Sequence, residues 1–203
     1  MITKEARLEL IVGTMFAGKS TELIRRATSY QGEGLQVQLF KPSIDNRYAE
    51  NYIASHDGLK MPAYNVASVA EMMTQTHPYA EVIGIEETQF FESGIIEACQ
   101  QYVSQGKIVI AAGLLKDFRD EAFAFKDGTK TMMDLFLTAN HVTILTALCK
   151  AQNERGEECK RAASRVQRFL DGQVAPYDSP VIQVGGKEDY APRCRQHYQF
   201  YKI

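Results

Sequence analysis

The segment best suited to do chemistry is a glycine-rich string near the N-terminus. Residues 13–20 are Gly-Thr-Met-Phe-Ala-Gly-Lys-Ser, which fits G-x-x-x-x-G-K-[ST] at every position. The glycines let the backbone turn so that its N–H groups point at phosphate oxygens, and a helix starting at Ser20 adds its positive dipole end. Lys19 would neutralise the β- and γ-phosphates, and Ser20 would offer a hydroxyl to Mg²⁺. The motif predicts nucleotide binding by Gly13, Thr14, Met15, Phe16, Ala17, Gly18, Lys19 and Ser20.

A pair of adjacent carboxylates forms the second candidate. Glu86 and Glu87 end the apolar segment 80–87. One carboxylate at such a place usually holds Mg²⁺, and a second can accept a proton or orient a nucleophile. Two surface acids at a solvated strand end are the plain alternative. Beside a phosphate loop, the functional interpretation is favoured.

Alternating strands and helices must position these residues. Short apolar runs predict strands at residues 8–13, 35–41, 80–87, 107–113 and 141–147, and helical spacing predicts helices at 20–31, 68–76, 94–106 and 131–139. A polar, turn-rich stretch at 41–62 predicts a long functional loop. The pattern predicts an α/β fold with a parallel sheet and helices on both faces. Ligands bind outside the carboxyl ends of such strands, so the loop and the carboxylates should face one edge.

Composition excludes several classes of protein. The chain has 203 residues, of which 45% are hydrophobic and 24% charged, and its formal net charge is −2. These values argue against a disordered or fibrous chain and against broad affinity for nucleic acid. No apolar run is long enough to span a membrane, and the first residues lack the features of a signal peptide. We therefore expect a cytoplasmic protein with neither a nucleic-acid nor a membrane partner.

The sequence changes character at its C-terminal end. Three of the four cysteines lie after residue 148, within polar sequence almost free of aliphatic residues. We predict a nucleotide-binding domain over residues 1–147 and a second, small domain over 148–203. A domain so poor in apolar residues usually needs a metal when it lies in a reducing compartment. Cys99, by contrast, lies within a predicted helix and is expected to be a buried core thiol.

A series of motifs resembles the type II thymidine kinases. In order, these are GTMFAGKSTEL, KPSIDNRY with SHDG, IEETQFF, AGLLKDFRDEAF, LTALC and VGGKEDYAPRCRQH. The resemblance covers residues 8 to 198. It implies transfer of the γ-phosphoryl group of ATP to the 5′-hydroxyl of thymidine, with Mg²⁺. It also implies a RecA-like P-loop domain, a small zinc-ribbon-like domain with a lasso loop, and a homotetramer.

The resemblance assigns roles to individual residues. It implies that Glu87 is the general base and that Glu86 is associated with Mg²⁺, and it places Glu86, Glu87, Thr88 and Gln89 among the residues that bind ATP and Mg²⁺. Asp45 and Arg47 resemble a pair near the phosphates. The nucleoside-binding residues implied are an aromatic that packs on thymine and the segment that closes over the base, namely Phe118, Val181, Ile182, Gln183, Val184, Gly185 and Tyr190.

The resemblance also implies one structural Zn²⁺. Its ligands would be Cys149, Cys159, Cys194 and His197. The family's first Cys-x-x-Cys pair is expanded here, since nine residues separate Cys149 from Cys159. The alternative is that these two are ordinary core thiols. Lengthening a flexible loop costs little, so we predict that the site survives and acts on nucleoside binding through the lasso.

Three further interpretations stay open. Glu86 replaces the family's usual Asp and Val166 a common Thr, so deoxyuridine or another pyrimidine nucleoside could be the preferred acceptor. Lys160, Arg161, Arg165 and Arg168 beside a zinc ribbon would suit a nucleic-acid-binding ATPase. The departures from the family pattern would also fit a catalytically inactive, nucleotide-sensing relative.

Overall fold

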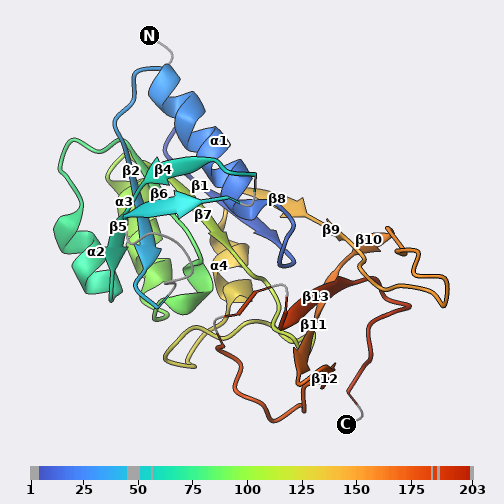
Figure 1. The fold of residues 1–203 in the computed structure, drawn as a ribbon. Helices are drawn as coiled ribbons and strands as arrows, with labels where there is room; N and C mark the ends of the chain where they lie inside the picture. The colour runs from blue at the N-terminus through green and yellow to red at the C-terminus, as the bar shows by residue number, and fades with distance from the viewer. Residues whose placement is uncertain (1–4, 45–50, 56, 184, 187, 202–203) are drawn as a thin grey trace.

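A parallel six-stranded sheet forms the centre of the computed structural model, which describes residues 5–44, 51–55, 57–183, 185–186 and 188–201 (Figure 1). The strand order is β5-β2-β6-β7-β1-β8, and every neighbouring pair is parallel. Burial on both faces explains the near-continuous apolar strands. The bounds are β1 (Arg7–Gly13), β2 (Val37–Pro42), β5 (Tyr64–Val66), β6 (Val82–Ile85), β7 (Ile108–Gly113) and β8 (His141–Leu145).

Helices cover both faces of this sheet, as predicted. On one face, α1 (Lys19–Gly32) packs against β2, β6 and β7 through Leu23, Ile24 and Ala27. The other face carries α2 (Val69–Gln75), α3 (Ile95–Ser104) and α4 (Met132–Thr138). Cys99 is fully buried on α3, and burial raises the pKa of its thiol to about 12. The predicted α/β class and the buried thiol are both confirmed.

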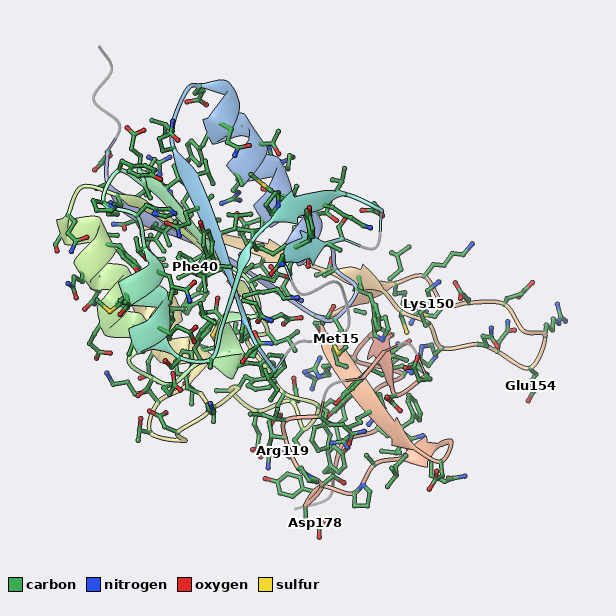
Figure 2. All side chains as sticks on the ribbon, turned by 60° about the vertical axis from the view of Figure 1, so that its left-hand side comes forward. Met15, Phe40, Arg119, Lys150, Glu154 and Asp178 are labelled. Atoms are coloured by element: carbon green, nitrogen blue, oxygen red, sulfur yellow. The ribbon has the colours of Figure 1, made fainter. Side chains whose placement is uncertain are left out.

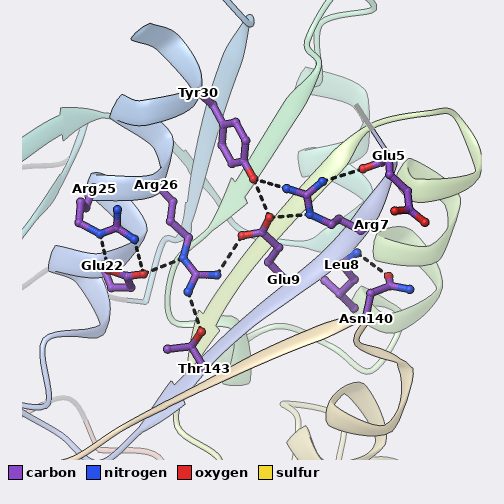
Figure 3. A network of polar contacts seen from close by, with 10 residues as sticks. All are labelled: Glu5, Arg7, Leu8, Glu9, Glu22, Arg25, Arg26, Tyr30, Asn140 and Thr143. Atoms are coloured by element: carbon purple, nitrogen blue, oxygen red, sulfur yellow. Dashed lines mark hydrogen bonds and ion pairs between the residues drawn. The ribbon is translucent and has the colours of Figure 1, made fainter. Parts of the chain in front are cut away.

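A polar network holds α1 against the sheet (Figure 3). The Glu9 carboxylate on β1 accepts hydrogen bonds from Arg7, at 2.8 Å, and from Arg26 and Tyr30 on α1, at 2.9 and 2.6 Å. Arg26 also bonds Glu22, at 2.8 Å, and the hydroxyl of Thr143 on β8, at 2.6 Å. One arginine therefore joins the helix to two neighbouring strands.

The stretch 41–62 is not loop throughout, which corrects the expectation. It contains a short antiparallel pair, β3 (Tyr52–Ala54) and β4 (Lys60–Pro62). Ile53 and Met61 are buried against the α1 side of the core. Three-residue strands with a single buried side chain each are too short to produce a recognisable alternation in the sequence.

The C-terminal part forms smaller sheets beside the main one, coloured orange to red in Figure 1. β9 (Ala147–Leu148) pairs with β10 (Ala162–Ala163), and β11 (Arg165–Leu170) lies between β12 (Gln173–Val174) and β13 (Tyr190–Arg193). The expected boundary after residue 147 falls inside β9 and stays a prediction. Among the residues described, no helix has the length and apolar character needed to cross a membrane.

Candidate functional site

The phosphate-loop motif joins β1 to α1. A Cβ on Gly13 would lie 2.3 Å from the carbonyl oxygen of Leu145, so only glycine fits there. Gly18 has a φ of 84° and caps α1, a conformation that glycine adopts without strain. The ammonium of Lys19 donates to the backbone oxygen of Thr14 at 3.0 Å, across the loop. The strand, turn and helix that the motif requires are therefore all present.

The two carboxylates follow β6, whose carboxyl end lies at the same sheet edge as the loop. The hydroxyl of Ser20 donates to the carboxylate of Glu86, which is 5% exposed. A hydroxyl and a carboxylate oxygen side by side are the hard ligands that Mg²⁺ takes in proteins, so these residues fit that ion.

Glu87 has a φ of 46°, in the left-handed region, and its side chain is half-buried. The amide of Gln89 donates to the Glu87 carboxylate at 2.6 Å. The oxygen of the same amide accepts from the backbone N–H of Leu114 at 3.0 Å. Thr88 is fully buried and donates to the carbonyl oxygen of Ala112 at 3.0 Å. Thr88 and Gln89 do not line the pocket; of the two, Gln89 is the one whose side chain holds the Glu87 carboxylate.

One pocket contains the loop, both carboxylates and an aromatic region. Its phosphate end is lined by Met15, Phe16, Ala17, Gly18, Lys19 and Ser20, and Glu86 and Glu87 form part of the wall. The remaining wall includes most of the predicted nucleoside-binding residues, namely Phe118, Val181, Gln183, Gly185 and Tyr190, together with Val166. Residues predicted to bind the phosphates and residues predicted to bind the nucleoside, far apart in the chain, therefore line one cavity.

The aromatic end is built around four buried residues, called here the acceptor cluster: Phe118, Val166, Ala175 and Tyr190. The hydroxyl of Tyr190 donates to the carbonyl oxygen of Gln183 at 2.9 Å, which links Gln183 to β13. A Cβ on Gly185 would lie 2.3 Å from an oxygen of the Asp189 carboxylate, so a larger residue there would displace that side chain. Ile182 does not line this pocket and packs against the main core.

Three cysteines and one histidine meet outside the sheet. The ligand atoms of Cys149, Cys159, Cys194 and His197, called here the metal cluster, all lie within 4.8 Å of one another. Nδ1 of His197 lies 3.6 Å from Sγ of Cys149 and 3.5 Å from Sγ of Cys194. Sγ of Cys159 lies 3.9 Å from Sγ of Cys194. A tetrahedral zinc with bonds of about 2.0–2.3 Å separates its ligands by roughly 3.5–3.8 Å, so the donors fit Zn²⁺ in type and spacing.

The residues between the first two cysteines form a hairpin. Gln152 and Glu158 pair across it, and the turn uses Gly156 at a φ of 77°. The N–H of Cys159 donates to the carbonyl oxygen of Ala151 at 2.8 Å, which returns the second cysteine beside the first. Figure 2 shows Glu154 at the tip, well away from the rest of the molecule. The nine-residue spacing therefore keeps Cys149 and Cys159 within one ligand set.

A comparison with protein families identifies the chain. The family model described as thymidine kinase matches residues 6–198. This chain belongs to the thymidine kinase family. Among solved structures, it is similar to the flagellar accessory protein FlaH from Methanocaldococcus jannaschii, with a TM-score of 0.45 and 12% identity over 71% of this chain and 72% of that one. That distant likeness has no bearing on function.

Several pocket residues of this thymidine kinase family member escaped the sequence analysis. Lys41 and Asp117 are 2% and 4% exposed, and both line the pocket. Lys41 lies near the carboxyl end of β2, where ligands bind in such sheets, so this position in the sequence could have identified it as a pocket residue. Asp117 bonds Arg119 at 2.8 Å within an irregular loop, where no spacing rule applies. Asp45, Arg47 and Val184, all predicted to be functional, lie outside the described residues.

Proposed function

We propose that this kinase transfers the γ-phosphoryl group of ATP to the 5′-hydroxyl of thymidine and forms thymidine monophosphate. The observation that carries the proposal is one pocket lined by the phosphate loop, the carboxylate pair and three residues of the acceptor cluster, Phe118, Val166 and Tyr190. Family membership supports the same reaction class.

The donor end would bind the triphosphate through Lys19 and the loop N–H groups. Ser20 and Glu86 would hold Mg²⁺, which offsets phosphate charge when bound. The 5′-oxygen would attack the γ-phosphorus as the bond from that phosphorus to the β–γ bridging oxygen breaks. Glu87 would orient the hydroxyl and take its proton, and ADP would leave. We assign Asp45 and Arg47 a supporting role near the phosphates.

The acceptor end would bind a flat pyrimidine. Phe118 offers an aromatic face, and the guanidinium of Arg168 lies over that ring at 5.3 Å. Backbone groups of the segment 181–185, held by Tyr190, would bind the base edge. We propose thymidine as the acceptor, with deoxyuridine as the closest competitor.

The remaining assignments concern cofactors, partners and assembly. We propose one structural Zn²⁺ in the metal cluster, a cytoplasmic location, and neither nucleic acid nor membrane as a partner. A homotetramer is supported by the outer edge of β8. That strand pairs only with β1 among the described residues, and it leaves Val142 and Ile144 exposed by 36% and 66%. Such an apolar edge favours pairing with another chain.

The test is a panel of nucleosides incubated with ATP, Mg²⁺ and purified protein, scored for the monophosphate. We expect thymidine to give the highest kcat/KM, and Lys19→Ala, which loses the phosphate-binding cation, to abolish turnover. Absence of turnover with every pyrimidine nucleoside would refute the proposal. Retention of single-stranded DNA on filters at moderate salt would instead favour a nucleic-acid-binding ATPase.

A further inference from the structure

Phe16 of the phosphate loop lies between two parts of the molecule. On one side it packs against the acceptor cluster. On the other, Phe16 and Ala17 pack against a second group of buried residues, Ala147, Cys149, Ala163 and Cys194, two of which belong to the metal cluster. The φ of Phe16 is 64°, in the left-handed region, which is unfavourable for a bulky residue. Surrounding contacts must therefore hold this conformation.

Thr14 makes a second connection between the loop and the metal-bearing strands. Its hydroxyl accepts from the N–H of Ala147 in β9 and donates to the carbonyl oxygen of Ala163 in β10, both at 3.4 Å. Its backbone oxygen accepts from the Lys19 ammonium at 3.0 Å. One residue thus contacts the phosphate-binding lysine and both strands that flank the first two cysteines.

The two strands that carry these contacts are very short. β9 and β10 are two residues long, and pairs this short are not stable alone. Cys149 follows β9 directly, and its backbone bonds Lys160 and Arg161, at 3.1 and 2.8 Å, next to Cys159. A metal bound by the four ligands would fix the surface against which Thr14, Phe16 and Ala17 pack.

We propose that the metal cluster stabilises the phosphate loop, so that metal occupancy sets the affinity for ATP as well as for the nucleoside. The proposal rests on the proposed function, because it takes ATP as the ligand of the loop. It extends the expectation from the sequence, in which zinc affects only nucleoside binding, through the lasso segment 181–185 and Tyr190. By linkage, a metal that tightens ATP binding must itself be held more tightly when ATP is bound.

The test uses this reciprocity on the zinc-loaded, full-length protein. Zinc loss to a chromogenic chelator is followed with and without saturating MgATP, well below the melting temperature. Far-UV circular dichroism is recorded in parallel. A typical coupling changes equilibrium affinity by at least about fivefold. Because a metal that is held more tightly should also be released more slowly, we expect MgATP to slow zinc loss by about the same factor. We expect calorimetry on chelator-treated protein that remains folded to show ATP affinity reduced by a similar factor.

Two variants of Thr14 test whether the coupling between the metal cluster and the phosphate loop runs through the Thr14 hydroxyl. Thr14→Val keeps the shape of the side chain but loses both hydroxyl contacts, whereas Thr14→Ser keeps the hydroxyl. We expect the slowing by MgATP to fall to less than half its wild-type value in Thr14→Val and to persist in Thr14→Ser. Because zinc loss is measured on loaded protein, the result does not depend on a folded metal-free form.

The outcomes separate this proposal from the proposed function. If calorimetry detects no ATP binding to zinc-loaded protein, the proposed function fails. If ATP binds with the same affinity with and without zinc, or slows zinc loss only as much as it slows global unfolding, the coupling is wrong and the kinase assignment stands. Equal protection in Thr14→Val and the wild type would also overturn the coupling through the loop.

Discussion

Glu87 combines an unfavourable backbone conformation with a fixed side chain. A φ of 46° is uncommon for any residue other than glycine, and such strain tends to persist where function requires a particular orientation. The hydrogen bond from Gln89, whose amide is oriented by Leu114, holds the carboxylate toward the pocket. The position of this one side chain therefore depends on a short chain of contacts through β7 and the segment after β6.

Glu87→Gln should reduce kcat by about 10²–10⁴-fold, because the amide keeps the size of the side chain but cannot take the proton. ATP affinity should stay within a few-fold, since the proposed contacts to the triphosphate come from Lys19 and the loop N–H groups. Steady-state kinetics and calorimetry measure the two quantities. Retention of more than about a tenth of wild-type kcat would rule out the general-base role.

Gly113→Ala should lower kcat indirectly, because Gly113 does not line the pocket but packs against Gln89. The added Cβ would lie 2.6 Å from the amide oxygen of Gln89 and 3.0 Å from the end of Met132, so Gln89 must shift away from Glu87. We expect roughly a tenfold fall in kcat, an order-of-magnitude value for a displaced positioning contact. Gly94→Ala, where a Cβ meets nothing within 4 Å, is the matched control. Unchanged kcat in Gly113→Ala would show that Gln89 does not position the base.

At the scale of elements, α1 is held on the sheet by charged side chains as well as by its apolar face. Burial by itself would raise the pKa of Glu9, but hydrogen bonds from Tyr30 and Arg26 and the charge of Arg7 lower it overall. Hydrogen bonds from Arg25, and then from Arg26, lower the pKa of Glu22 from 4.5 to about 2. Both carboxylates are therefore stabilised in their charged form by folding.

This network predicts an acid-sensitive contribution to stability. A carboxyl whose pKa is lowered by folding stabilises the protein above its unfolded pKa and loses that effect as pH falls through the folded pKa. We expect Glu22→Gln to lower the melting temperature at pH 7 and to flatten its fall between about pH 4.5 and 2. Glu154→Gln, on the exposed hairpin, should leave the profile unchanged. A Glu22→Gln profile parallel to the wild type would contradict the assignment.

The metal cluster gives a second prediction at this scale. Cys159→Ser should remove the metal and lower the melting temperature by about 10 °C or more, because structural zinc contributes several kcal/mol to folding. Cys99→Ala, which removes a buried thiol far from the ligands, should keep one metal ion per chain. Elemental analysis and calorimetry provide the measurements. Full metal content in Cys159→Ser would remove Cys159 from the ligand set.

At the scale of the whole molecule, the outer edge of the main sheet is the feature most relevant to assembly. β8 exposes Ile144 there, and Leu137 on the preceding helix is 77% exposed. Apolar edge strands are normally covered or charged in monomers. In the part of the chain that the structure describes, β8 has a neighbouring strand on one side only, and Ile144 and Leu137 are exposed.

Ile144→Lys should therefore reduce the mass of the proposed homotetramer, because it places a charge at the edge of β8. Light scattering after size exclusion measures that mass. Leu170→Lys, also at an exposed apolar residue but on β11, should leave it unchanged. A tetrameric Ile144→Lys variant would exclude the β8 edge as the interface, and a monomeric wild type would refute the tetramer itself.

Local spacing in the sequence was sufficient to predict the main motifs and most of the secondary structure of the central sheet. The phosphate loop, the carboxylates after a buried strand and the alternation of strands and helices each depend on neighbours a few residues apart, whose geometry is set by backbone sterics and hydrogen bonding. For the same reason, the parallel sheet and the common edge shared by Ser20 and Glu86 could be predicted. The four metal ligands were also named from the sequence, although only through a resemblance.

Tertiary structure alone decided the rest. The strand order, the β3–β4 pair and the packing of Phe16 between the acceptor cluster and Cys149 depend on contacts between residues far apart in the chain. No periodicity of two or 3.6 residues encodes such contacts. The ten-residue step from Cys149 to Cys159 left core thiols as an alternative to the predicted ligand pair, because spacing measures distance along the chain. A hairpin brings its two ends together in space, and metal binding depends on that second distance.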